Sequence, residues 1–403
     1  MASNERINVP VSNEVSKGYK VLYSLSVLLY APLSVYSSGI SSFLLSDIFL
    51  YIVTFILSLC IFEKKNKVVP AYIVFVPIAY IFFFSLLFAL DNTSVLLRTA
   101  RYIYYLLFVA VFGKSFFSVE ISLSIYEKIA VFSTLFIIVQ YVLYFGAGFY
   151  LPGYLPFLNV AREELVLYSF NIYTAVNQRM RSVFSEPAHY AAYVAFYMYL
   201  VLIRNGLSKI VLKDVFVCLF ITLGIVLSAS TTGVSLAALG WSFFFLFKCL
   251  NKRIDLKYGL FFPFIVAVIL SVLQIDNVQN AIFRLTENSA QEGRLINTFK
   301  VDVSSFSTSS LFGHGMDLQE MYLASFGRML FYFGIVGTLI VVVSFFIYSI
   351  KNKFAFLVFL FMMVMGVGTA LWVSGNIILY LSFLLAYSTY SQEANQNNIS
   401  FYK

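Results

Sequence analysis

Runs of about 20 apolar residues, repeated along almost the whole chain, constrain the fold more than any other feature of the sequence. A helix needs about 20 mostly apolar residues to cross a bilayer. Twelve such runs lie near 19–40, 44–62, 69–90, 95–113, 128–150, 188–203, 213–229, 233–249, 257–274, 329–350, 354–372 and 376–390. Charged residues make up 11% of the 403, less than half of the roughly 25% found in soluble domains. The sequence therefore predicts an all-α polytopic membrane protein with about 12 transmembrane helices, in which residues 1–403 form a single integral membrane domain.

Composition also argues against several other classes of protein. The polar N-terminus, Met1 to Val15, lacks the pattern of a cleaved signal peptide. Cys60, Cys218 and Cys249 show neither a disulfide pattern nor metal-ligand spacing. The net charge of +8 mainly reports topology in a membrane protein, so it does not indicate nucleic-acid binding.

Lysine and arginine are distributed unequally between the two predicted sides of the membrane. Cytoplasmic connections carry an excess of basic residues, and a cytoplasmic N-terminus places about 18 of the 27 basic residues inside, with the C-terminus also cytoplasmic. Of 16 lysines only Lys300 then lies outside, whereas eight of 11 arginines do. These are Arg98, Arg101, Arg162, Arg179, Arg181, Arg284, Arg294 and Arg328. Because a guanidinium group can hold an oxyanion with two hydrogen bonds, this arginine excess indicates an anion site.

Two outside connections, near 151–187 and 275–328, are much longer than the others. Loops beyond about 12–15 residues are usually functional or disordered. Both contain amphipathic pieces, at Leu165–Ile172 and Leu295–Val303. We therefore expect two ordered loops that carry short helices over the membrane.

The first long loop ends in a candidate catalytic segment. Pro187 is expected at the first helical position, which makes Glu186 the N-cap and places His189 about one turn into the helix. A helix N-terminus favours an ionised Glu186, which could accept a proton from a sugar hydroxyl. The alternative is that Glu186 only caps the helix and pairs with Arg181, and that His189 only makes a local hydrogen bond.

The second long loop holds Arg284, Arg294 and a Gly313-His314-Gly315 turn, and ends at Arg328. Between 275 and 328 six acidic residues outnumber four basic ones, so general attraction to anionic lipid explains the arginines poorly. Either they are paired with those acids or they are held for a particular anion. For His314 the alternative is a plain turn.

Arg98 and Arg101 are three residues apart and therefore share one face in the outer half of the fourth span. An arginine in a span normally faces a protein interior or a polar cavity. The alternative is that both side chains extend to the membrane interface.

Several signatures are missing from the sequence. The outside face has no Asp-X-Asp pair for a divalent metal, and there is no glycine-rich phosphate loop, ATPase signature or nucleophile–histidine–carboxylate motif. Charged residues deep in the spans are nearly missing, which disfavours a pump built on buried carboxylates. We expect no metal and no cofactor.

Three further features of the sequence belong together: Arg-Ser-Val-Phe-Ser-Glu-Pro-Ala-His-Tyr at 181–190, Leu-Ser-Ala-Ser-Thr-Thr-Gly at 227–233, and the spaced Arg284 and Arg294 followed by Gly313-His314-Gly315. With the many spans and the two long arginine-bearing loops, these motifs resemble the Wzy family of O-antigen and polysaccharide polymerases, which is related to the O-antigen ligases. Ligases often carry a His-Asn pair where this chain has Glu320-Met-Tyr, which favours the polymerase. Relatives often have Gly where Val183 stands.

The resemblance implies a GT-C-like, metal-independent glycosyltransferase of the bacterial inner membrane. Donor and acceptor would both be glycans on undecaprenyl diphosphate, and the growing chain would pass to a new repeat unit at the periplasmic face. A flippase and a chain-length regulator are the implied protein partners, beside membrane lipid.

An acceptor hydroxyl would attack the anomeric carbon as lipid diphosphate leaves, and without a metal the arginines must stabilise its charge. The substrate-binding candidates are Arg98, Arg101, Arg181, Arg284, Arg294, His314 and Arg328, with Glu186 or His189 as the base. A single displacement would invert the anomeric centre. The alternatives are an O-antigen ligase of the same fold, a lipid-linked oligosaccharide flippase or other transporter, and a scaffold in which the arginines are dispensable.

Overall fold

The computed structural model describes residues 15–40, 43–64, 70–89, 92–149, 151–155, 157–161, 180–208, 210–250, 311–316 and 323–397. The α-helices in these ranges are α1 (Lys17–Leu33), α2 (Leu45–Lys64), α3 (Phe75–Ala89), α4 (Thr93–Phe116), α5 (Val119–Ala147), α7 (Pro187–Leu207), α8 (Leu212–Leu227), α9 (Thr231–Leu250), α16 (Ser325–Ser349), α17 (Lys353–Gly368) and α18 (Ile377–Asn397). Two short 3₁₀ turns join them, η1 (Tyr72–Val74) and η4 (Leu371–Val373). Within these ranges, β-structure is limited to two isolated bridges.

Five of these helices are long and apolar enough to cross a membrane: Leu45–Phe62, Thr93–Phe116, Val119–Ala147, Thr231–Leu250 and Ser325–Ser349. The prediction of a helical protein with membrane-spanning segments is therefore confirmed. Of the predicted runs, the one near 257–274 lies outside the described residues, and each of the others coincides with a helix. The total of 12 spans and the GT-C-like arrangement stay predictions.

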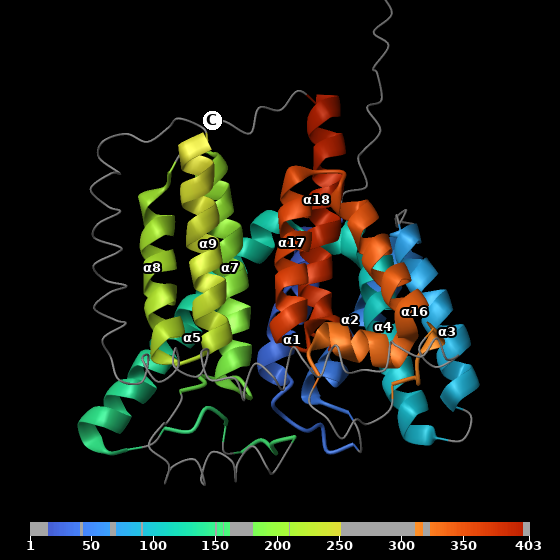
Figure 1. Ribbon diagram of the computed structural model, residues 1–403, viewed down its shortest axis with the longest axis horizontal. Helices are drawn as coiled ribbons and strands as arrows, with labels where there is room; N and C mark the ends of the chain where they lie inside the picture. Colours follow the sequence, from blue (N-terminus) through green and yellow to red (C-terminus); the bar gives the residue numbers. More distant parts are fainter. Residues whose placement is uncertain are drawn as a thin grey trace, which may run out of the picture.

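Successive helices run in opposite directions from α1 to α9 and again from α16 to α18, so the molecule has two distinct ends (Figure 1). One end, here called the lysine end, carries Lys17, Lys20, Lys114, Lys213, Lys248, Lys351 and Lys353. The other, here called the loop end, carries residues 151–161, residues 180–186 and the starts of α7, α9 and α16.

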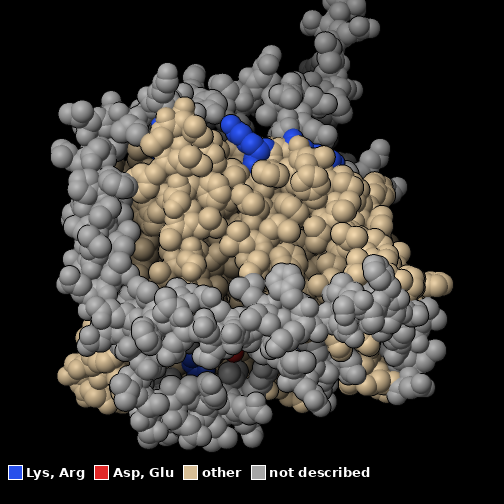
Figure 2. Space-filling model, viewed as in Figure 1, with Lys and Arg blue, Asp and Glu red and all other residues tan. Residues whose placement is uncertain are grey.

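The surface between the two ends suits a lipid environment. Figure 2 shows charged side chains near both ends and, among the described residues on this face, a broad band between the ends without them. Large apolar side chains are exposed on the helices; Phe55 in α2 and Phe83 in α3, for example, are each 66% exposed. A surface this apolar is characteristic of a face that contacts membrane or another protein.

Helix α7 lies at the centre of the bundle, since every residue from 190 to 203 is buried. It is apolar on all sides, the pattern of a fully buried helix. Its closest neighbour is α9, where a side chain at Gly233 would collide with Ala191. Small residues allow such close backbone approach in membrane helices. The polar segment that opens α7 is therefore fixed to the centre of the loop end.

Helix α16 differs from the continuous span expected near 329–350. It begins at Ser325 and is interrupted at Gly334, whose φ of 65° and ψ of −174° are not helical. Figure 1 shows its first part lying across the loop end, at a large angle to the second part. A residue other than glycine is strained at this φ, and a Cβ at Gly334 would also collide with the Leu311 carbonyl.

The Gly313-His314-Gly315 turn fills this break in α16. The amide of His314 donates to the carbonyl of Phe331 (2.8 Å), and the amide of Gly315 donates to that of Tyr332 (3.0 Å). The hydroxyl of Tyr80 in α3 donates to the carbonyl of Phe333 (3.0 Å). Buried carbonyls must be paired, so the turn supplies the hydrogen bonds that the helix lacks at this point.

Candidate functional site

The segment that precedes α7 is held by hydrogen bonds from α5. The amide of Ser182 donates to Gln140 Oε1 (2.9 Å), and the Ser182 hydroxyl donates to the Ser133 carbonyl (2.8 Å). Gln140 Nε2 also donates to the Leu151 carbonyl (2.9 Å). A side chain at Gly153 would collide with the Ser182 carbonyl. Gln140 therefore joins the two described ends of the first long loop to the bundle.

Aromatic side chains also hold the segment that precedes α7. Phe184 is 1% exposed, and its ring centroid lies 5.9 Å from that of Tyr190 and 5.1 Å from that of Tyr193. The Tyr190 hydroxyl is hydrogen-bonded to Thr134 in α5 (2.9 Å). Pro187 occupies the first helical turn, as predicted. The Arg181–Tyr190 motif is thus a rigid turn inserted into an aromatic core.

Arg181 is the unusual member of this motif, because it is buried without a full set of partners. Its exposed fraction is 6%. Nη1 donates to the Ser185 carbonyl (3.2 Å), and the guanidinium lies 5.7 Å from the Tyr154 ring centroid. Nε and Nη2 have no hydrogen-bond partner among the described residues. An unsatisfied buried donor costs about 1–3 kcal/mol, and more if charged, so this geometry favours an anion beside Arg181.

Glu186 and His189 follow Arg181 in the same segment and are exposed at the surface. Glu186 occupies the N-cap position, as predicted, but its side chain makes no capping hydrogen bond. None of the ion pairs among the described residues joins Glu186 to Arg181. Both Glu186 and His189 are exposed, and His189 Nδ1 lies 2.5 Å from the Ser185 hydroxyl oxygen. Ser185 therefore connects the buried guanidinium to this exposed imidazole, because its carbonyl accepts from Arg181 and its hydroxyl contacts His189.

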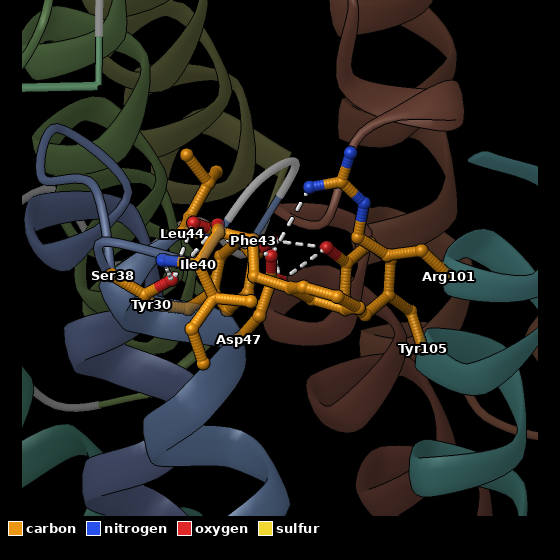
Figure 3. Close-up of polar contacts among 8 residues, drawn as sticks. All are labelled: Tyr30, Ser38, Ile40, Phe43, Leu44, Asp47, Arg101 and Tyr105. Carbon is orange, nitrogen blue, oxygen red and sulfur yellow. Dashed lines mark hydrogen bonds and ion pairs between the residues drawn. The ribbon is translucent and has the colours of Figure 1, made fainter. Parts of the chain in front are cut away.

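A second polar cluster lies around Asp47 in the first turn of α2 (Figure 3). Asp47 is fully buried. Its Oδ2 accepts from the Leu44 amide (3.0 Å) and from Arg101 Nη1 (3.1 Å). Its Oδ1 accepts from the hydroxyls of Tyr105 (2.5 Å) and Tyr30 (3.1 Å). The predicted substrate-binding residue Arg101 is thus paired with a carboxylate, and its side chain is 24% exposed.

Sequence reasoning missed Asp47, although a signal was present. It is the one acidic residue in the apolar run at 44–62, and an ionisable residue inside a span is a functional candidate by default. Its pairing with Arg101 was not visible, because the two residues are 54 positions apart.

The remaining candidates lie at the loop end or outside the described residues. Arg98 is half-buried in α4, and Arg328 Nε donates to the Leu323 carbonyl (2.8 Å). His314 is exposed, and its ring stacks on Phe331 at 4.6 Å.

Arg284 and Arg294 fall outside the described ranges, as do the amphipathic pieces Leu165–Ile172 and Leu295–Val303. Among the predicted residues, Arg181 and His189 both contact Ser185, the residue that precedes Glu186. The structure places Arg101 in a separate cluster.

Comparison with protein-family models, with curated proteins and with solved structures found no match. Within the described ranges, no three His, Cys, Asp or Glu side chains are placed to hold a metal ion. The fold defines the protein as a helical one with membrane-spanning segments.

Proposed function

We propose that this protein is a glycosyltransferase that polymerises oligosaccharide repeat units carried on undecaprenyl diphosphate. The growing chain would be transferred onto a new lipid-linked repeat unit, with inversion at the anomeric carbon. The loop end would face the periplasm of a bacterial inner membrane, because the lysines gather at the opposite end and basic residues favour the cytoplasmic side. Both termini would then be cytoplasmic.

Arg181 is the observation that carries the proposal. A departing lipid diphosphate develops negative charge, and preorganised donors in a site shielded from water stabilise such charge most effectively. Arg181 is buried and is oriented by the Ser185 carbonyl. Its Nε and Nη2 atoms have no hydrogen-bond partner among the described residues. These two N–H groups form one edge of the planar guanidinium, the arrangement that binds two phosphoryl oxygens at once.

The base is proposed at the start of α7. Glu186 is exposed and uses no side-chain atom for capping, so its carboxylate is available to accept a proton from the acceptor hydroxyl. His189 is the second candidate, one turn away. Arg98, Arg284, Arg294, His314 and Arg328 stay proposed contributors to substrate binding.

One structural feature bears on the transporter alternative. Broken helices are typical of transporters, where the freed backbone groups bind the substrate or an ion. In α16, however, the carbonyls of Phe331, Tyr332 and Phe333 are occupied by His314, Gly315 and Tyr80. The break is therefore filled by the protein itself, which supports the transferase over the transporter. An O-antigen ligase of the same fold stays the alternative within the enzyme class.

The decisive experiment uses purified protein in lipid nanodiscs, supplied with undecaprenyl-diphosphate-linked repeat units. A ladder of lipid-linked products of increasing length supports a polymerase. A wild-type protein that forms no glycosidic bond contradicts the proposal, and transfer that requires a lipid A core acceptor identifies a ligase instead.

Arg181→Lys keeps the charge but loses the fork. Losing one charge-assisted hydrogen bond, worth about 1.5–3 kcal/mol, lowers turnover by about 10- to 150-fold. Arg204→Lys is the matched control, because Arg204 pairs with Asp214 at the lysine end (2.7 Å), and it should retain activity. Full activity of Arg181→Lys would remove Arg181 from the site.

A further inference from the structure

The Asp47–Arg101 pair is the strongest feature that the proposed mechanism leaves unused. Both residues belong to apolar helices that are long enough to span a membrane. Charged groups are expensive there and usually functional. A buried ion pair adds little to stability, because desolvation offsets much of the attraction. Stability alone therefore explains the pair poorly.

Groups other than Arg101 already hold the carboxylate of Asp47 in place. The Leu44 amide and the hydroxyls of Tyr105 and Tyr30 all donate to it. The two tyrosine oxygens also lie 2.6 Å apart. Because α1, α2 and α4 each supply a part of this network, the carboxylate oxygens have a defined direction (Figure 3).

Arg101 uses only one of its guanidinium nitrogens in this network. Nη1 donates to Asp47 Oδ2 at 3.1 Å, and this is the one hydrogen bond that the guanidinium makes to the described residues. The side chain is 24% exposed, whereas that of Asp47 is fully buried. The buried carboxylate of Asp47 therefore binds one nitrogen of the Arg101 guanidinium. The other two nitrogens of this guanidinium are left for a ligand at the loop end.

Arg101 and Arg181 differ in electrostatic balance. Arg101 is neutralised by Asp47, whereas no ion pair with Arg181 occurs among the described residues. An arginine whose charge is neutralised by a carboxylate contributes oriented hydrogen bonds to a ligand, and adds little net positive charge to the site. It therefore suits recognition of a phosphoryl group that keeps its charge during the reaction.

We infer that Asp47 is a positioning residue, which orients Arg101 so that its remaining N–H groups bind a phosphoryl oxygen of a lipid-linked substrate at the loop end. The inference deepens the proposed function and rests on it. Tyr105 and Tyr30 contribute indirectly, because they hold the Asp47 carboxylate, which in turn orients the Arg101 guanidinium.

A similar pair at the lysine end provides a matched control. Asp214 Oδ2 accepts from Arg204 Nη2 (2.7 Å) and from Asn205 Nδ2 (2.9 Å), and Asp214 is buried. The substitution Asp214→Asn therefore disrupts an equivalent ion pair at the end of the molecule where no substrate is proposed to bind.

The test measures KM, kcat and the Kd for undecaprenyl diphosphate for Asp47→Asn, Arg101→Ala and the double variant. Each single change should raise KM and Kd by about 10- to 150-fold, the equivalent of one charge-assisted hydrogen bond, with kcat nearly unchanged. The double variant should be no worse than Arg101→Ala, because Asp47 acts through Arg101. Asp214→Asn should leave KM and Kd unchanged.

The inference would be overturned if the two single substitutions had multiplying effects on Kd in the double variant. It would also be overturned if Asp47→Asn left Kd unchanged. Should Asp47→Asn fail to fold, Tyr105→Phe removes one donor while keeping the ion pair, and an unchanged Kd there would also contradict it. A wild-type protein that binds undecaprenyl diphosphate but makes no polymer overturns the proposed function alone, and the binding measurements still test the inference.

Discussion

At the residue scale, two arginine side chains at the loop end, those of Arg101 and Arg181, have different environments. Arg101 is balanced by a buried carboxylate, whereas Arg181 is 6% exposed and has two unpartnered nitrogens among the described residues. Desolvation makes an uncompensated buried charge costly, so Arg181 is the arginine whose environment most favours a bound anion. Arg101 is already satisfied on one side and gains less from binding.

Glu186→Gln separates catalysis from stability at this position. The carboxylate makes no capping hydrogen bond and is exposed, so the free energy of unfolding should change by less than about 0.5 kcal/mol. Loss of a general base should lower kcat by about 100- to 10,000-fold. Thermal unfolding and single-turnover assays on the same preparation measure both quantities. If the variant is fully active, the base lies elsewhere, and His189 becomes the first residue to test.

At the element scale, the interruption of α16 sets the architecture of the loop end. A continuous helix from Ser325 would project along the bundle, whereas the break at Gly334 lays its first part across the loop end (Figure 1). Gly313 and Gly334 make this possible, because both have positive φ and both face backbone where a Cβ would collide. The turn and the broken helix therefore form one unit, built from segments that approach each other through glycine.

Gly334→Ala should destabilise the protein by about 1–3 kcal/mol, because alanine is strained at this φ and its Cβ meets the Leu311 carbonyl. Gly146→Ala in α5 is the control, since nothing lies within 4 Å of a Cβ there and alanine is the better helix former. Thermal unfolding in one detergent compares the two. Equal melting temperatures for Gly334→Ala and the wild type would mean that the break does not need glycine.

At the scale of the whole molecule, the two ends differ in charge and in backbone structure. Among the described residues, the connections at the lysine end from α4 to α5 and from α16 to α17 are short, and the loop end holds both polar clusters and the break in α16. This asymmetry fits a protein whose chemistry takes place at one membrane surface. It also gives the proposed orientation a direct test.

Cys249 serves as a built-in reporter of orientation, because it is exposed at the lysine end while Cys60 and Cys218 are buried. In intact spheroplasts a membrane-impermeant maleimide should leave the protein unlabelled, and permeabilisation should allow labelling. Phe157→Cys in a Cys249→Ser background is the complement, since Phe157 is 77% exposed in the first long loop. That variant should be labelled before permeabilisation. The reverse pattern would place the proposed site in the cytoplasm.

The described helices, the gathering of lysine at one end and the turn that opens α7 could all be predicted from the sequence. These features are local: a span needs a continuous apolar run, and a Pro at the first helical position identifies a helix start within a few residues. Pro187 and the N-cap position of Glu186 were predicted in this way and are confirmed.

Which polar groups meet could not be predicted from the sequence and follows from the packing of the helices. Asp47 reaches Arg101 across 54 positions, and Tyr80 in α3 pairs with the carbonyl of Phe333, 253 positions away. No periodicity in the sequence encodes such contacts, because they depend on which helices become neighbours and on how deeply each buries its polar side chains. In an apolar bundle few polar groups are available, so the packing of the helices selects the partner of each one.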